Sequence, residues 1–128
     1  MKQYQDKKIA IVGSGLIGAG WTIHLLCHGV KDIVMYDPIP EALERAKGLV
    51  AQGLNFFVEN GAITAQQKEE FEKVPRYTAE MVESVSQADF ILENVPENLD
   101  LKRCVLAEIE SFCAPRCRDY LQHLRHYD

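Results

Sequence analysis

The stretch Ile9–Gly18, with the sequence Ile-Ala-Ile-Val-Gly-Ser-Gly-Leu-Ile-Gly, predicts a short apolar strand, a glycine turn and the start of a helix. The turn has the form G-x-G-x-x-G. Gly13 permits a tight turn out of the strand, and Gly15 has no side chain to keep a pyrophosphate away from the backbone. Gly18 lets the helix press against the sheet, and the helix N-terminus offers N–H groups to a phosphate. The candidate phosphate-binding residues are Gly13, Gly15, Leu16, Ile17 and Gly18.

A carboxylate follows the next expected strand. Residues 32–36 form a second apolar run, and Asp37 stands at its end, 24 positions after Gly13. This is close to the roughly 20-residue offset at which an acid accepts hydrogen bonds from an adenosine ribose. A carboxylate here would repel the 2′-phosphate of NADP, and the segment 38–40 contains no Arg to compensate. The two motifs together predict a dinucleotide site that prefers NAD.

The rest of the chain alternates strand-like and helix-like stretches, a pattern typical of a parallel sheet covered by helices. We therefore predict an α/β fold, a Rossmann-type doubly wound parallel sheet truncated after about four strands. Gly48 and Gly53, inside the long second helix, indicate close packing or a bend. Four apolar residues of the last helix are expected to form its buried stripe: Leu101, Val105, Ile109 and Phe112. The expected strands are 8–12, 32–36, 76–78 and 90–92, and the expected helices are 16–28, 41–60, one opened by Thr64, 79–85 and 99–112.

Composition excludes several classes of partner. The net charge is −5 and no basic stretch exceeds two or three residues, which argues against nucleic acid and anionic membranes. No apolar run approaches the roughly 20 residues that span a bilayer, and the polar N-terminus favours a cytoplasmic protein. The four cysteines are expected to be buried or semi-buried free thiols. His24 and His28 have the spacing of a helical metal pair, but no third ligand stands nearby, so no metal site is predicted.

Four motifs resemble those of one known family. They are G-S-G-L-I-G-A-G at 13–20, Y-D at 36–37, A-D-F-I-L-E at 88–93 and V-P-E-N-L-D-L-K at 95–102. From about residue 7 to residue 115 the chain resembles the N-terminal NAD-binding domain of the 3-hydroxyacyl-CoA dehydrogenases. The last motif is the most discriminating, because a generic nucleotide-binding fold does not need it. The resemblance implies NAD as cofactor and the oxidation of a small 3-hydroxy substrate to the 3-oxo compound.

The resemblance also implies roles for individual residues. Asp37 would hold the adenosine ribose, and the turn 13–18 would hold the pyrophosphate. Val95, Glu97 and Lys102 would lie near the nicotinamide half. Without the family pattern, the preferred explanation is that Glu97 is an acid at a helix start and that Lys102 is a solvated side chain.

Trp21 follows the glycine motif directly. This favours the branch that contains L-gulonate 3-dehydrogenase, lambda-crystallin and carnitine dehydrogenase, and the alternative is that Trp21 is a core aromatic. The substrate stays open among acyl-CoA, gulonate and carnitine. A competing hypothesis is a non-catalytic nucleotide-binding fragment or a crystallin-like structural protein.

The segment 115–128 departs from the family's pattern. The family continues into a fifth strand and a Ser-Ser-Thr-Ser stretch, whereas this tail has no continuous apolar run. Residues 115–128 can be encoded by a set of synonymous codons from which the deletion of one C gives the sequence expected for the family. We therefore expect that a frameshift produced this tail. The alternative is a genuine lineage-specific tail. We expect an NAD-binding domain at 1–114 and no catalytic residue in this chain. The family's catalytic His–Glu pair and its helical C-terminal domain, needed for a homodimer, come after this point.

Overall fold

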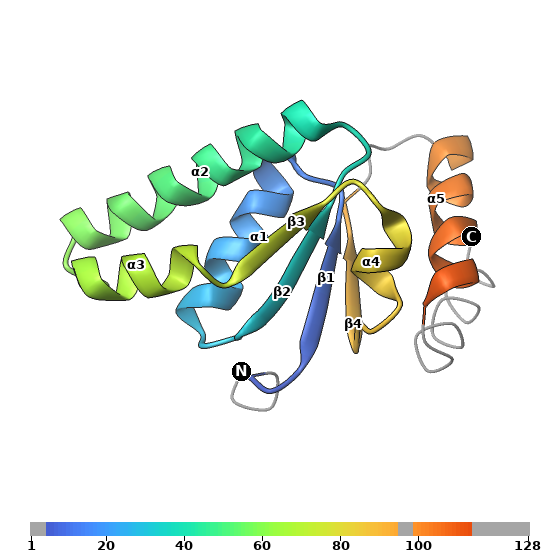
Figure 1. Cartoon of the computed structure of the whole chain (residues 1–128). Coiled ribbons are helices and arrows are strands. Elements are labelled where there is room, and N and C mark those ends of the chain that lie inside the picture. The colour runs from blue at the N-terminus through green and yellow to red at the C-terminus, as the bar shows by residue number, and fades with distance from the viewer. Residues whose placement is uncertain (1–4, 95–98, 114–128) are drawn as a thin grey trace.

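The structure, a computed structural model, describes residues 5–94 and 99–113. Its strands are β1 (Lys8–Val12), β2 (Asp32–Tyr36), β3 (Pro75–Thr78) and β4 (Phe90–Glu93). They form one parallel sheet in the order β3-β2-β1-β4 (Figure 1). The two central strands, β1 and β2, are almost entirely buried, as expected for a sheet with helices on both faces.

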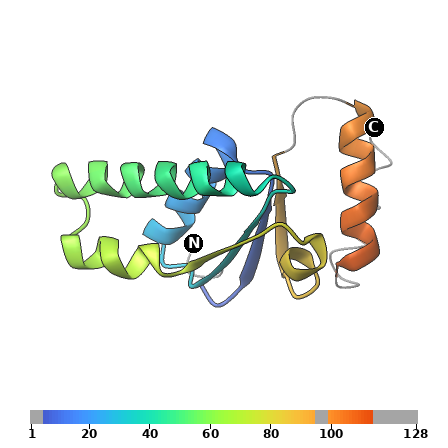
Figure 2. The same cartoon turned by 45° about the horizontal axis from the view of Figure 1, so that its top comes forward.

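Helices cover both faces of this sheet. In the described part of the chain they are α1 (Gly15–Cys27), α2 (Pro40–Glu59), α3 (Ala65–Glu72), α4 (Met81–Val85) and α5 (Leu99–Phe112). Helices α1 and α2 pack with Ile11 and Met35 on one face, whereas α4 and α5 pack with Val12 and Val34 on the other. Both views show α2 and α3 as an antiparallel pair that extends beyond the sheet (Figure 2). The predicted doubly wound α/β fold is confirmed.

Close packing inside α2 occurs at one of the two expected glycines. A Cβ built on Gly53 would clash with Cδ1 of Ile23, so this glycine allows α2 to approach α1. A Cβ on Gly48 would meet no atom within 4 Å in the described structure, because α2 turns this position to solvent. The expectation of close packing is therefore wrong at Gly48.

The buried stripe of α5 is narrower than predicted. Ile109 is fully buried and Val105 is half-buried, but Leu101 and Phe112 are each 43% exposed. Among the described elements α5 packs chiefly against α4, so both ends of the stripe are left uncovered. Trp21 is 41% exposed, so the alternative that it is a core aromatic is wrong as well.

Two of the three described cysteines are more exposed than expected, and Cys117 lies outside the described residues. Cys113 is buried, whereas Cys27 and Cys104 are exposed free thiols. Cys27 lies on α1, beside a hollow that residues of α2 also line, and Cys104 lies on α5; neither belongs to the two buried clusters of the core. The ring centroids of His24 and His28 lie 4.4 Å apart with their planes inclined by 58°. Among the described residues, no group of three or more side chains could hold a metal ion. None of the described helices is both long and apolar enough to cross a membrane.

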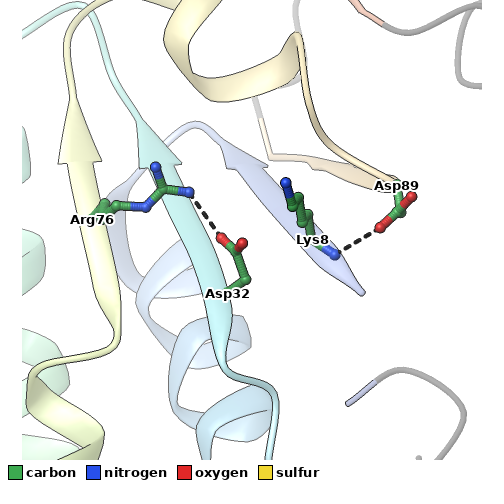
Figure 3. A network of polar contacts seen from close by, with 4 residues as sticks. All are labelled: Lys8, Asp32, Arg76 and Asp89. Atoms are coloured by element: carbon green, nitrogen blue, oxygen red, sulfur yellow. Dashed lines mark hydrogen bonds and ion pairs between the residues drawn. The ribbon is translucent and has the colours of Figure 1, made fainter. Parts of the chain in front are cut away.

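Polar contacts join neighbouring strands at the amino-terminal end of the sheet (Figure 3). The Asp89 carboxylate accepts a hydrogen bond of 2.9 Å from the backbone N–H of Lys8, and the Asp89 N–H donates to the Lys8 carbonyl at 2.7 Å. Arg76 Nη2 lies 2.8 Å from Asp32 Oδ1, which links β3 to β2. These contacts support the register of the strands at the end of the sheet that is remote from the glycine turn.

Candidate dinucleotide site

The glycine turn joins the carboxyl end of β1 to α1. Gly13 and Gly15 have φ angles of +97° and +94°, a backbone region that side chains with a Cβ rarely adopt. The N–H of Gly13 donates a 2.9 Å hydrogen bond to the carbonyl of Tyr36, which ties the turn to the end of β2. A Cβ on Gly15 would meet no described atom within 4 Å. The backbone at Gly15 therefore borders open space into which a ligand can fit.

The third glycine of the motif lies where α1 packs against the turn. A Cβ built on Gly18 would lie 2.5 Å from the carbonyl oxygen of Gly13, far inside van der Waals contact. Residue 18 is buried, and the atom in the way belongs to the backbone. This is the close helix–strand approach that the sequence predicts for Gly18.

The Asp37 carboxylate lies against the glycine turn. Its Oδ2 accepts hydrogen bonds from the Ser14 hydroxyl at 2.7 Å and from the Ser14 N–H at 3.2 Å. Its Oδ1 accepts from the N–H of Ile39 at 2.9 Å. A carboxylate has about four acceptor positions and three are used here, so about one remains for a ribose hydroxyl. The protein therefore orients this carboxylate before any ligand binds.

Ser14 is a site residue that sequence reasoning missed. It is the N-cap of α1, yet its side chain makes no capping hydrogen bond and donates to Asp37 instead. The N–H groups of the first turn, which includes Leu16 and Ile17, are thus left for a ligand. Those two side chains are 78% and 66% exposed. The available signal was a hydroxyl side chain between two glycines.

The electrostatics beside Asp37 involve a neutral phenol. Burial raises the pKa of Tyr36, and the carboxylates of Glu108, Asp37 and Glu80 raise it further. Tyr36 therefore stays uncharged at physiological pH. It adds no negative charge next to a site suited to an anionic diphosphate.

The order of the strands creates a crevice beside the glycine turn. From β1 the chain leads to β2 and β3 on one side, and β4 pairs with the other side of β1. Open α/β sheets bind ligands at such a topological switch point, outside the carboxyl ends of the strands. The glycine turn and Asp37 both lie at this edge.

The predicted residues for the nicotinamide half lie after β4. Lys102 Nζ is 3.7 Å from Oε2 of Glu93, the last residue of β4, so α5 presents this lysine at the same edge of the sheet. Val95 and Glu97 lie outside the described residues. The structure therefore brings Lys102 to the edge that holds the glycine turn.

This fold, its switch point and the glycine turn define a Rossmann-type dinucleotide-binding domain. Residues 8–117 match the family model described as "3-hydroxyacyl-CoA dehydrogenase, NAD binding domain". The chain therefore belongs to this family of NAD-binding domains.

Similar proteins of known sequence agree with this assignment. An L-carnitine dehydrogenase from Nocardiopsis dassonvillei is 37% identical over 105 residues, which cover 82% of this chain and 30% of that protein. An L-carnitine dehydrogenase from Mesorhizobium japonicum is 39% identical over 106 residues, which cover 81% of this chain and 27% of that protein. The predicted family, with its lean toward the branch of the carnitine dehydrogenases, is confirmed.

A solved structure shows the same arrangement. The 3-hydroxybutyryl-CoA dehydrogenase from Escherichia coli K12 substr. MG1655 superimposes with a TM-score of 0.78 at 30% identity, covering 86% of this chain and 23% of that one. The chain thus spans less than a third of the length of each of these three proteins.

Proposed function

We propose that this chain binds NAD at the carboxyl edge of its sheet. The pyrophosphate would lie against the glycine turn 13–18, with the adenosine ribose on Asp37. The observation that carries this proposal is the 2.7 Å hydrogen bond between Ser14 and Asp37, which are 23 residues apart. It brings the phosphate-binding turn and the ribose-binding carboxylate close enough for one ligand to contact both.

The residues present fit this cofactor. Gly15 leaves open space beside the backbone, and the first-turn amides of α1 favour an anion. We propose Val95, Glu97 and Lys102 for the nicotinamide half, since Lys102 lies at the edge where β1 and β4 end. A bound NAD would supply the hydride acceptor for the oxidation of a secondary alcohol. The residues of this chain would bind and orient it.

The reaction class proposed for the longer relatives is the oxidation of a 3-hydroxy compound to the 3-oxo compound, with L-carnitine as the first candidate substrate. Removal of the hydroxyl proton needs a base within about 2.6–3.2 Å. The two described histidines, His24 and His28, lie at the far end of α1 from the glycine turn. We propose that the domain 1–114 binds NAD without catalysing this reaction and that an anomalous tail follows at 115–128. From the polar N-terminal residues we also propose a cytoplasmic location.

A titration with NADH tests this function. Trp21 is the single tryptophan of the chain and lies on α1, close to the glycine turn, so its fluorescence is expected to fall to a plateau as NADH binds. Incubation of the same protein with NAD and either L-carnitine or 3-hydroxybutyryl-CoA should produce no NADH absorbance. The absence of a saturable signal would overturn the binding proposal. Turnover would overturn the proposal that the chain binds without catalysis.

The choice between NAD and NADP is a separate prediction. The negative charge of Asp37 should disfavour the 2′-phosphate, so we expect the dissociation constant for NADPH to exceed that for NADH by at least about tenfold. Replacing Asp37→Ser should narrow this ratio, because the hydroxyl carries no charge. Competition titrations against the Trp21 signal would measure both constants. Equal or tighter binding of NADPH to the unmodified chain would show the prediction to be wrong.

A further inference from the structure

One buried polar group near the switch point has no partner. The side-chain Nδ2 of Asn94 is buried, and the described structure provides no hydrogen-bond acceptor for it. A buried donor without an acceptor is unfavourable, and folded proteins leave few such groups. A ligand that carries an acceptor could account for this amide.

The position of Asn94 follows from the sheet. Its N–H donates to the carbonyl of Val12 at 2.8 Å, so the β1–β4 ladder continues one residue past β4. Since Val12 pairs with Glu93, the next residue along lies beside Gly13 of the glycine turn. Asn94 therefore borders the crevice from the β4 side, opposite the Asp37 side.

The alternation of side chains gives the face on which Asn94 lies. Leu92, two residues earlier, packs with Ile11 and the residues of α1 and α2. Residues i and i+2 of a strand share a face, so Asn94 is directed to the face on which α1 begins. Glu93, between them, contacts Lys102 of α5 on the other face. Asn94 is therefore on the face of the first-turn amides.

We propose that Asn94 is a cofactor-positioning residue, whose amide donates a hydrogen bond to an oxygen of the nicotinamide-side ribose or its phosphate. This inference rests on the proposed binding of NAD. With the adenosine ribose on Asp37, at the end of β2, an extended NAD molecule that crosses the glycine turn would have its nicotinamide nucleotide at the end of β4. Neighbouring strands lie about 4.8 Å apart, so β2 and β4 are separated by roughly 10 Å, a distance that a dinucleotide spans.

The experiment uses the variant Asn94→Ala and two ligands of different length. Thermal unfolding is measured without ligand, and the dissociation constants of NADH and AMP are measured by Trp21 fluorescence. We expect NADH to bind about tenfold more weakly, which corresponds to one lost hydrogen bond. AMP, which lacks the nicotinamide half, should bind within twofold of the unmodified chain. The midpoint of unfolding should not fall, because the variant removes a donor that has no partner.

Asn55→Ala is the matched control. Asn55 is exposed on α2 and bonds to Glu59 within the same helix, so neither dissociation constant should change. A lower unfolding midpoint for Asn94→Ala, with NADH affinity kept, would show a purely structural role and overturn the inference. Equal weakening of AMP and NADH would overturn it too, because the whole site would be disturbed. If the unmodified chain binds neither ligand, the proposed function itself fails, and this inference with it.

Discussion

Gly18→Ala is expected to lower the free energy of unfolding by about 2–4 kcal/mol and to abolish saturable NADH binding. The added Cβ would lie 2.5 Å from the carbonyl oxygen of Gly13. That oxygen belongs to the backbone of the turn, so no change of side-chain rotamer can remove the clash. Either α1 moves away from β1 or the turn changes shape, and both outcomes separate the first-turn amides from Asp37.

Gly20→Ala is the control for this change. Gly20 lies two residues further along the same helix and is exposed, and a Cβ added there would meet no described atom within 4 Å. The substitution there should increase stability by up to about 1 kcal/mol, because alanine favours a helix over glycine. Urea denaturation of both variants measures the difference. Equal stability of the two would show that α1 does not pack on the turn as described.

Asp37→Ala is expected to weaken NADH binding by about 10- to 100-fold, the range for losing charge-assisted hydrogen bonds to a ribose. The same change leaves the Ser14 hydroxyl without its partner, which frees it to cap α1. Fluorescence titration against NADH measures the loss. Inorganic pyrophosphate has no ribose, so its affinity should fall much less.

Asp32→Ala is the control for Asp37, because it removes a carboxylate from the opposite end of the same strand. Asp32 pairs with Arg76 at the amino-terminal edge of the sheet (Figure 3), remote from the glycine turn. NADH affinity should therefore be unchanged, and the exposed ion pair should cost less than about 1 kcal/mol of stability. If Asp37→Ala binds NADH within twofold of the unmodified chain, the assignment of the ribose to Asp37 is wrong.

Local chemistry made most of the elements predictable. The hydrogen bonds of a capping box are an example: Thr64 Oγ1 accepts from the Gln67 N–H at 3.0 Å, and Gln67 Oε1 accepts from the Thr64 N–H at 2.8 Å. Gly29 and Gly61 end their helices with positive φ angles, as their places after apolar helical patterns indicate. These signals depend on residues within four positions of one another, so the sequence contains them directly.

The site was predictable in part. The glycine motif and Asp37 stand out because each has a fixed place relative to a strand end. The sequence does not reveal the hydrogen bond from Ser14 to Asp37 or the unpartnered amide of Asn94. Both depend on how β1 lies against β2 and β4 in space. The exposure of Leu101 likewise depends on which elements reach α5, not on the period of its apolar residues.

The sequence by itself determined the class of fold, the glycine turn, the acid after the second strand and the family of the chain. Only the tertiary structure decided that Ser14 orients Asp37 and that Gly18 packs against Gly13. It also decided that the buried amide of Asn94 lies on the opposite side of the crevice from Asp37. The physical reason is the separation along the sequence of the residues that interact. Strand and helix signals act over a few residues, whereas these contacts join side chains and backbone that come together only when parallel strands align their carboxyl ends.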